Sequence, residues 1–137
     1  MRPTEVWRVL LQKAAQDEYV VDQLIELPQS PDEILGFHLQ QAAEKYLKSL
    51  LSHLRIEYRF THNLGELMHI LEKKGHPVPP ELRELKRLTP FATEWRYDFI
   101  AGEGESALDR KAMRQLVVLL REWVRKTMAA HQEAENP

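Results

Sequence analysis

The chain has 137 residues, of which 43% are hydrophobic and 29% are charged, and its formal net charge is −2. This balance is typical of a globular chain and excludes an intrinsically disordered one. The small negative charge gives no support for a dedicated double-stranded nucleic-acid binder, which usually has a basic excess. The chain has no cysteine, which excludes a disulfide scaffold, a thiol nucleophile and thiolate metal sites.

No apolar run approaches the ~20 residues that a membrane-spanning helix needs. The first residues, Met1 to Glu5, lead directly into an amphipathic pattern and contain no signal-peptide core. A chain of this length can bury most of the surface that it exposes when unfolded. We therefore expect one cytoplasmic domain over residues 1–137, without membrane association.

Two helices are predicted in the first part of the chain. Apolar residues recur at helical spacing from Thr4, a residue type that caps helices, to about Leu27. The proline-containing segment at residues 28–31 ends this pattern. Ser30 is the expected cap of a second helix, with Pro31 at its first position, and its apolar stripe continues to about residue 54.

A shorter helix is predicted over residues 64–74. Thr61 or Asn63 can cap its start, because both side chains accept hydrogen bonds from free helix amides. Gly75 follows the last residue and has the usual composition of a helix C-terminal cap.

The second half of the chain contains a helical region at residues 81–99 and a last helix. Proline lacks an amide hydrogen, so we expect at Pro90 either a kink or two helices with Thr89 as a new cap. Residues 106–109 are expected to open the last helix, which reaches about Ala130. The tail from His131 is expected to be frayed.

No alternating pattern long enough for a strand is present. Short connections between helices favour antiparallel neighbours. The sequence therefore predicts an all-α fold, an antiparallel up-and-down helical bundle of four main helices plus a short helix.

Polar residues follow one another along the second helix. His38, Gln41, Lys45 and Lys48 are separated by three, four and three residues, which places them on one line of the helix. Glu44 stands four residues before Lys48 and can pair with it. Such a line is either an ordinary solvated stripe or a binding face.

His62 stands at the start of the short helix, where free amides attract anions. It can contact a phosphate there, or it can hydrogen-bond a backbone carbonyl and hold the loop in place. The six histidines show no His-x3-His pair and no accompanying ligand cluster, so no metal site is expected.

Arg96 and Tyr97 lie near the end of the fourth helical region. The planar guanidinium of Arg96 is suited to a phosphate or a carboxylate. Its neighbours Glu94 and Asp98 are equally available as structural partners.

Three segments together resemble the HEPN family: Phe37 to Leu51, Thr61 to Leu64, and Trp95 to Tyr97. HEPN proteins are small helical proteins that are associated with nucleotide or RNA binding and are often paired with a minimal nucleotidyltransferase. The string from Gln40 to Lys45 is similar to the family signature. The family usually has proline after the Arg-Tyr pair, whereas Asp98 follows here.

The resemblance implies a homodimer in which polar residues of the second helix face a groove between helices. It also implies a toxin–antitoxin-like pairing with a separately encoded nucleotidyltransferase, a nucleotide as ligand, and no cofactor. RNA as a ligand stays open. The expected nucleotide-binding residues are His38, Gln41, Glu44, Lys45, Lys48, His62, Arg96 and Tyr97.

Ribonucleases of the HEPN superfamily carry an arginine, four to six further residues and then a histidine near the start of the last long helix. After Arg96, residues 101–103 are alanine, glycine and glutamate. Arg55 and His62 have this spacing, but they lie in the loop after the second helix. We therefore expect a non-catalytic module. The alternatives are a ribonuclease toxin with a non-standard site, such as Arg55 with His62, and a purely structural dimeric interaction protein.

Overall fold

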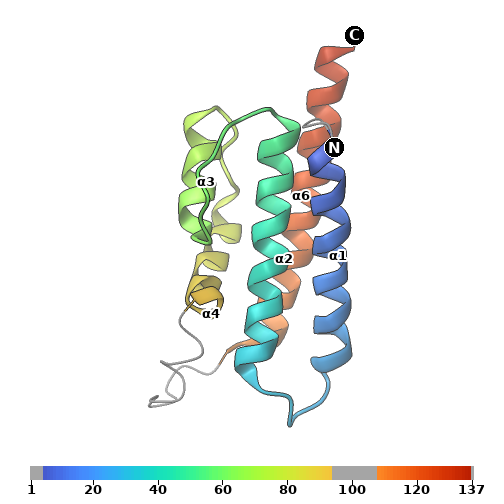
Figure 1. Ribbon diagram of the computed structural model, residues 1–137, viewed down its shortest axis with the longest axis vertical. Coiled ribbons are helices and arrows are strands. Elements are labelled where there is room, and N and C mark those ends of the chain that lie inside the picture. The colour runs from blue at the N-terminus through green and yellow to red at the C-terminus, as the bar shows by residue number, and fades with distance from the viewer. Residues whose placement is uncertain (1–4, 94–107, 137) are drawn as a thin grey trace.

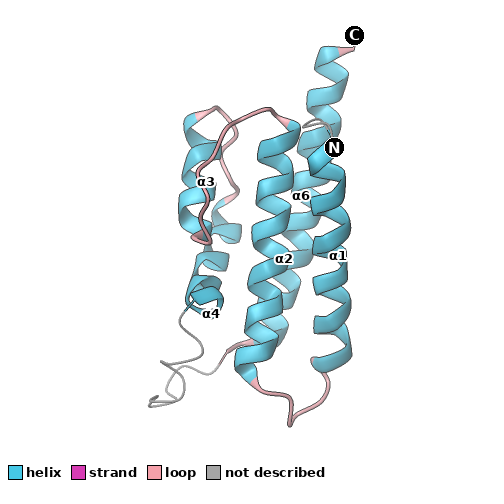
Figure 2. Ribbon diagram, in the orientation of Figure 1, coloured by secondary structure: helices cyan, strands magenta, loops and turns pink. Residues whose placement is uncertain are grey.

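The computed structural model describes residues 5–93 and 108–136, which form helices and loops with no strand among them (Figures 1 and 2). The predicted all-α fold is confirmed. The elements are α1 (Val6–Leu24), α2 (Asp32–His53), α3 (Leu64–Lys73), the 3₁₀ helix η2 (Pro80–Leu88), α4 (Thr89–Thr93) and α6 (Arg110–Glu135). The expected cap Thr4 lies outside the described residues.

Helix α2 lies at the centre of the bundle and contacts α1, α3, η2, α4 and α6. In Figure 1, α1 descends, α2 ascends, η2 and α4 descend, and α6 ascends. The shorter α3 lies beside α2, and in the chain it comes between α2 and η2. The alternation agrees with an up-and-down bundle in which η2 and α4 together take the place of the fourth main helix.

The hydrophobic core lies where the apolar stripe of each helix faces α2. The stripe of α2 itself is fully enclosed, and Tyr46 is the largest side chain in it. Helix α6 contributes one buried residue at nearly every turn, which confirms the predicted apolar face of the last helix. The buried residues of α6 are Met113, Val117, Leu120, Val124 and Met128.

The start of α2 differs from the prediction that Ser30 caps it. Pro31 is the residue before the helix, with an extended backbone at φ −68° and ψ 137°, and it places Ser30 outside the helix. The Ser30 hydroxyl instead lies 2.9 Å from the carbonyl of Leu24 and 2.8 Å from that of Leu27. Ser30 therefore completes the end of α1, which finishes three residues earlier than expected.

Proline 90 separates two helices rather than kinking one. Thr89 is the first residue of α4 rather than its predicted cap, and its hydroxyl oxygen accepts a hydrogen bond from the Leu64 amide, 3.1 Å away, at the start of α3. Asn63 caps α3 as expected, since its side-chain oxygen accepts from the Glu66 amide. Gly75 follows α3 with φ 91°, a conformation that glycine adopts without strain.

Helix α6 continues past the expected end at about Ala130 and reaches Glu135, within the tail expected to be frayed from His131. His131 Nε2 lies 3.4 Å from Glu135 Oε1, and the Asn136 amide donates to the carbonyl of Gln132. At its other end α6 is capped by Asp109, whose side chain accepts from the Ala112 amide. Interactions between residues four apart thus extend the helix beyond its last buried turn.

Candidate functional site

The polar line of α2 divides into two groups, each centred on a buried carboxylate. The first carboxylate belongs to Asp17 of α1. Its Oδ1 lies 2.9 Å from His38 Nδ1, and its Oδ2 accepts from Lys45 Nζ at 2.6 Å. His38 and Lys45 therefore tie α2 to α1 through one aspartate.

The second group surrounds Glu44, whose side chain is only 6% exposed. Lys48 Nζ donates to Oε2 at 2.7 Å, Gln40 Nε2 donates to Oε1 at 2.9 Å, and His62 Nδ1 lies 3.1 Å from Oε1. Gln40 also donates to the backbone carbonyl of His62, and Gln41 donates to the side-chain oxygen of Gln40. These contacts fix the loop before α3 against the face of α2.

The charge state of Glu44 follows from these contacts. Burial alone raises the pKa of this carboxyl, but the hydrogen bonds from Lys48, Gln40 and His62 and the charge of Lys48 outweigh burial. The pKa of Glu44 therefore lies below its ordinary value, and the group is an ionised acceptor at neutral pH.

Aromatic residues of the loop after α2 surround Lys48 on the outer side of the Glu44 group. The Lys48 ammonium lies 5.3 Å from the ring centre of Phe60 and 5.9 Å from that of Tyr58. The rings of Phe60 and His62 meet edge to face at 5.1 Å, and Phe60 is 80% exposed. We call Lys48, Tyr58, Phe60 and His62 the Phe60 surface. An exposed ring beside a cation can stack a nucleobase or an apolar side chain.

The structure thus brings Glu44, Lys48 and His62 together, with Gln41 joined to them through a neighbouring amide. His38 and Lys45 belong to the separate Asp17 group. The predicted residues Arg96 and Tyr97 lie outside the described residues.

The spacing match between Arg55 and His62 does not correspond to a contact within the described residues. Arg55 lines a pocket at the end of α2, whereas the His62 ring lies on Glu44.

A third buried carboxylate, Glu18, is the centre of a network between α1, α2 and α6. Glu18 Oε1 accepts from Arg114 Nη1 at 2.7 Å and from Arg121 Nη1 at 2.8 Å, while the Tyr46 hydroxyl donates to Oε2. Burial and the Glu18 carboxylate raise the pKa of Tyr46, so its hydroxyl stays a donor. We call these four residues the Glu18 cluster; it joins three helices.

The sequence interpretation missed Asp17, Glu18, Gln40 and Phe60. The first two were detectable, because both acids interrupt the apolar stripe of α1 and must therefore face partners. Gln40 is fully buried, although the sequence places it beside Gln41 with no signal to distinguish the two. The position of Phe60 depends on the loop conformation.

Within residues 5–93 and 108–136, no group of three or more histidine, aspartate or glutamate side chains is placed to hold a metal ion. Over the same described ranges, no helix combines the length and the hydropathy that crossing a bilayer requires.

The family model described as HEPN domain matches residues 8–127, which is most of the chain. The match covers α1, α2, α3 and most of α6, including both carboxylate groups of the polar face. No curated protein and no solved structure gives a significant match.

Proposed function

The chain belongs to the HEPN domain family, and from this premise we propose that it is a non-catalytic module whose Phe60 surface binds a nucleotide. The observation that carries the proposal is the exposure of Phe60, 80%, directly beside the Lys48 ammonium and the His62 ring. An exposed aromatic ring next to a cation is a suitable platform for stacking a nucleobase.

The geometry supports base stacking as the main contribution to binding. Stacking a base on an aromatic side chain contributes about 1–3 kcal/mol and tolerates every base. The Lys48 charge lies under the ring, and the half-buried His62 imidazole lies at its edge, within the same surface. His62 is therefore the group placed to hydrogen-bond the ribose or the phosphate of a stacked nucleotide.

The same contacts support a non-catalytic role. A general base or acid needs a side chain that can gain or lose a proton next to the substrate. His62 and Lys48 both bond to Glu44, which stays ionised. These contacts use both side chains to position the loop before α3.

We further propose that the module acts as a homodimer beside a separately encoded nucleotidyltransferase, in a toxin–antitoxin-like pair. Support comes from the family resemblance at residues 37–51 and from an exposed aromatic site that a nucleotide-handling partner could share. Co-purification of the chain with such an enzyme, with and without nucleotide, tests this part of the proposal.

The binding test is a thermal-shift and calorimetric series with ATP, GTP, CTP, UTP and a short RNA. A ligand at ~100 times its dissociation constant stabilises the folded state by ~2.7 kcal/mol, which is a shift of several degrees for a domain of this size. Phe60→Ala should abolish the shift. Tyr19→Ala is the matched control, because Tyr19 is an exposed aromatic residue, 66%, on α1. Equal loss in both variants would contradict the proposal.

One observation favours a second candidate function, a structural interaction protein without a small ligand. Asp17 and Glu44 together pair with His38, Lys45 and Lys48, so the polar face is largely satisfied within the chain. In that case Phe60 is an apolar contact for a protein surface. A flat response to every nucleotide, together with a change of oligomeric mass in Phe60→Ala, would establish this alternative.

A further inference from the structure

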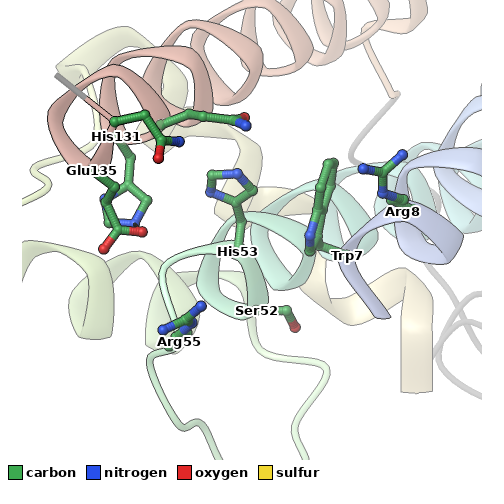
Figure 3. Close-up of a pocket in the computed structure, with 9 residues that line it drawn as sticks. Trp7, Arg8, Ser52, His53, Arg55, His131 and Glu135 are labelled. Carbon is green, nitrogen blue, oxygen red and sulfur yellow. Dashed lines mark ion pairs between the residues drawn. The ribbon is translucent and has the colours of Figure 1, made fainter. Parts of the chain in front are cut away.

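A pocket of about 180 Å³ opens at the end of the bundle where α2 and α6 finish and α1 begins (Figure 3). Two arginines, Arg8 and Arg55, and two histidines, His53 and His131, line it. Its volume is below the ~300–1,000 Å³ of pockets that enclose drug-sized ligands, so it suits a small ion or group. None of the residues that line this pocket belongs to the Phe60 surface.

Within the described residues, neither arginine of the pocket pairs with a carboxylate. Most of the other described arginines do. Arg8 instead places its guanidinium 4.8 Å from the ring centre of Trp7, on the side of that ring away from His53 (Figure 3). The arginines that do have carboxylate partners are Arg59, Arg83, Arg87, Arg110, Arg114 and Arg121.

The backbone at Arg55 gives an independent reason to assign its side chain a role. Arg55 has φ 60°, in the left-handed region that favours glycine. Its amide donates to the carbonyl of Ser52, and the next amide, of Ile56, donates to that of Leu51. This is the helix-ending position at which glycine is most common. The chain keeps an arginine there at a conformational cost, and that arginine lines the pocket.

The histidines make the charge of the pocket adjustable. His53 lies between Trp7 and His131, with ring centres 4.8 Å and 5.5 Å away (Figure 3). Burial and then the neighbouring His131 lower the pKa of His53, while Glu135 opposes the shift. A bound anion would favour the protonated form of His53, so binding would be accompanied by proton uptake.

Some groups oppose an anion. Glu135 lies 3.4 Å from His131, and the ends of α2 and α6 direct negative dipole ends toward this region. Against them stand the charges of Arg8 and Arg55, the positive end of α1, and the imidazoles once protonated. The balance is positive and becomes more positive as the pH falls.

We propose that this pocket binds a small oxyanion with two negative charges, the phosphate group of a phosphorylated small molecule, through Arg55 and the two histidines, while Arg8 adds positive charge from the other side of Trp7. Guanidinium groups suit such an anion because their planar donors match its oxygens.

Calorimetric titration of the full chain with sodium sulfate, at constant ionic strength, tests the site. Sulfate stays a dianion near neutral pH, so its own protonation does not interfere. Arg55→Gly removes the side chain and leaves a residue suited to φ 60°; it should stay at least as thermally stable and bind sulfate at least about tenfold more weakly. Arg125→Gln is the charge control outside the pocket and should bind as the original chain does.

Affinity for sulfate should rise from about pH 8 to about pH 6, and His53→Gln should flatten this dependence. Tighter binding of glycerol phosphate than of inorganic phosphate would support a phosphorylated molecule as the ligand. The reverse order would overturn that assignment in favour of the free ion. Absence of saturable sulfate binding, or equal weakening in Arg55→Gly and Arg125→Gln, would overturn the site itself.

Discussion

The Glu18 cluster and the Glu44 group each compensate the charge of a buried carboxylate, at different places in the bundle. Each buries a glutamate and bonds it to three side-chain donors. The donors of Glu18 come from two other helices, α2 and α6, whereas those of Glu44 come from α2 itself and one loop. The Glu44 group continues outward to the exposed Phe60, whereas no contact within residues 5–93 and 108–136 joins the Glu18 cluster to an exposed aromatic side chain. The buried carboxylate of Glu18 therefore holds helices together, whereas that of Glu44 holds the loop that carries the exposed Phe60.

The largest expected effect is on the Glu18 cluster. Glu18→Gln removes the charge that pairs with Arg114 and Arg121, and we expect the free energy of unfolding to fall by about 3 kcal/mol, because two partly buried guanidiniums lose their partner. Urea unfolding measures this change. Asp22→Asn is the matched control, since Asp22 also pairs with Arg114 but is 52% exposed, and it should cost less than about 1 kcal/mol. Equal costs would contradict the assignment.

A smaller effect, with a distinct pH dependence, is expected at Glu44. Glu44→Gln should cost about 2 kcal/mol at neutral pH, because it removes charge-assisted hydrogen bonds. The pKa of Glu44 is lowered in the folded state from 4.5. Its contribution is therefore present above about pH 4.5 and is lost as the pH falls through the folded pKa. The stability curves of the two proteins should converge in acid; a constant gap would argue against an ionised Glu44.

The smallest effect on stability is expected at Phe60. Phe60→Ala removes an exposed ring and one cation–π contact with Lys48, so the free energy of unfolding should change by less than about 1 kcal/mol. Urea unfolding of Phe60→Ala and of Glu44→Gln, measured side by side, compares the contribution of the Phe60 surface to stability with that of the Glu44 group beneath it. A larger loss would show that Phe60 belongs to the packed structure and would weaken its proposed role in binding.

Much of the fold was predictable because helical periodicity is a local property. The apolar spacing located α1, α2, α3 and α6 to within a few residues, apart from the longer end of α6. The 3₁₀ geometry of η2 had a signal that the prediction did not use. Its buried residues Leu82, Leu85 and Leu88 recur every three positions, which matches a helix of three residues per turn.

The site was less predictable because it depends on pairs that are distant in sequence. The spacing of Glu44 and Lys48 predicted their ion pair, and the pair forms. The contact of His62 with Glu44 spans 18 positions and requires the loop conformation. The burial of Gln40 rather than Gln41 depends on how α2 is rotated against its neighbours.

The Glu18 cluster also has a consequence for the order of folding. The contacts between α1 and α2 join neighbouring segments, whereas Arg114 reaches Glu18 across 96 positions. Closing the short loop costs less entropy, so the α1–α2 hairpin forms before α6 docks. Until then Glu18 has only Tyr46 as a partner in this cluster. During synthesis, the hairpin therefore holds an incompletely neutralised carboxylate, and it gains its full stability only when the last helix has left the ribosome.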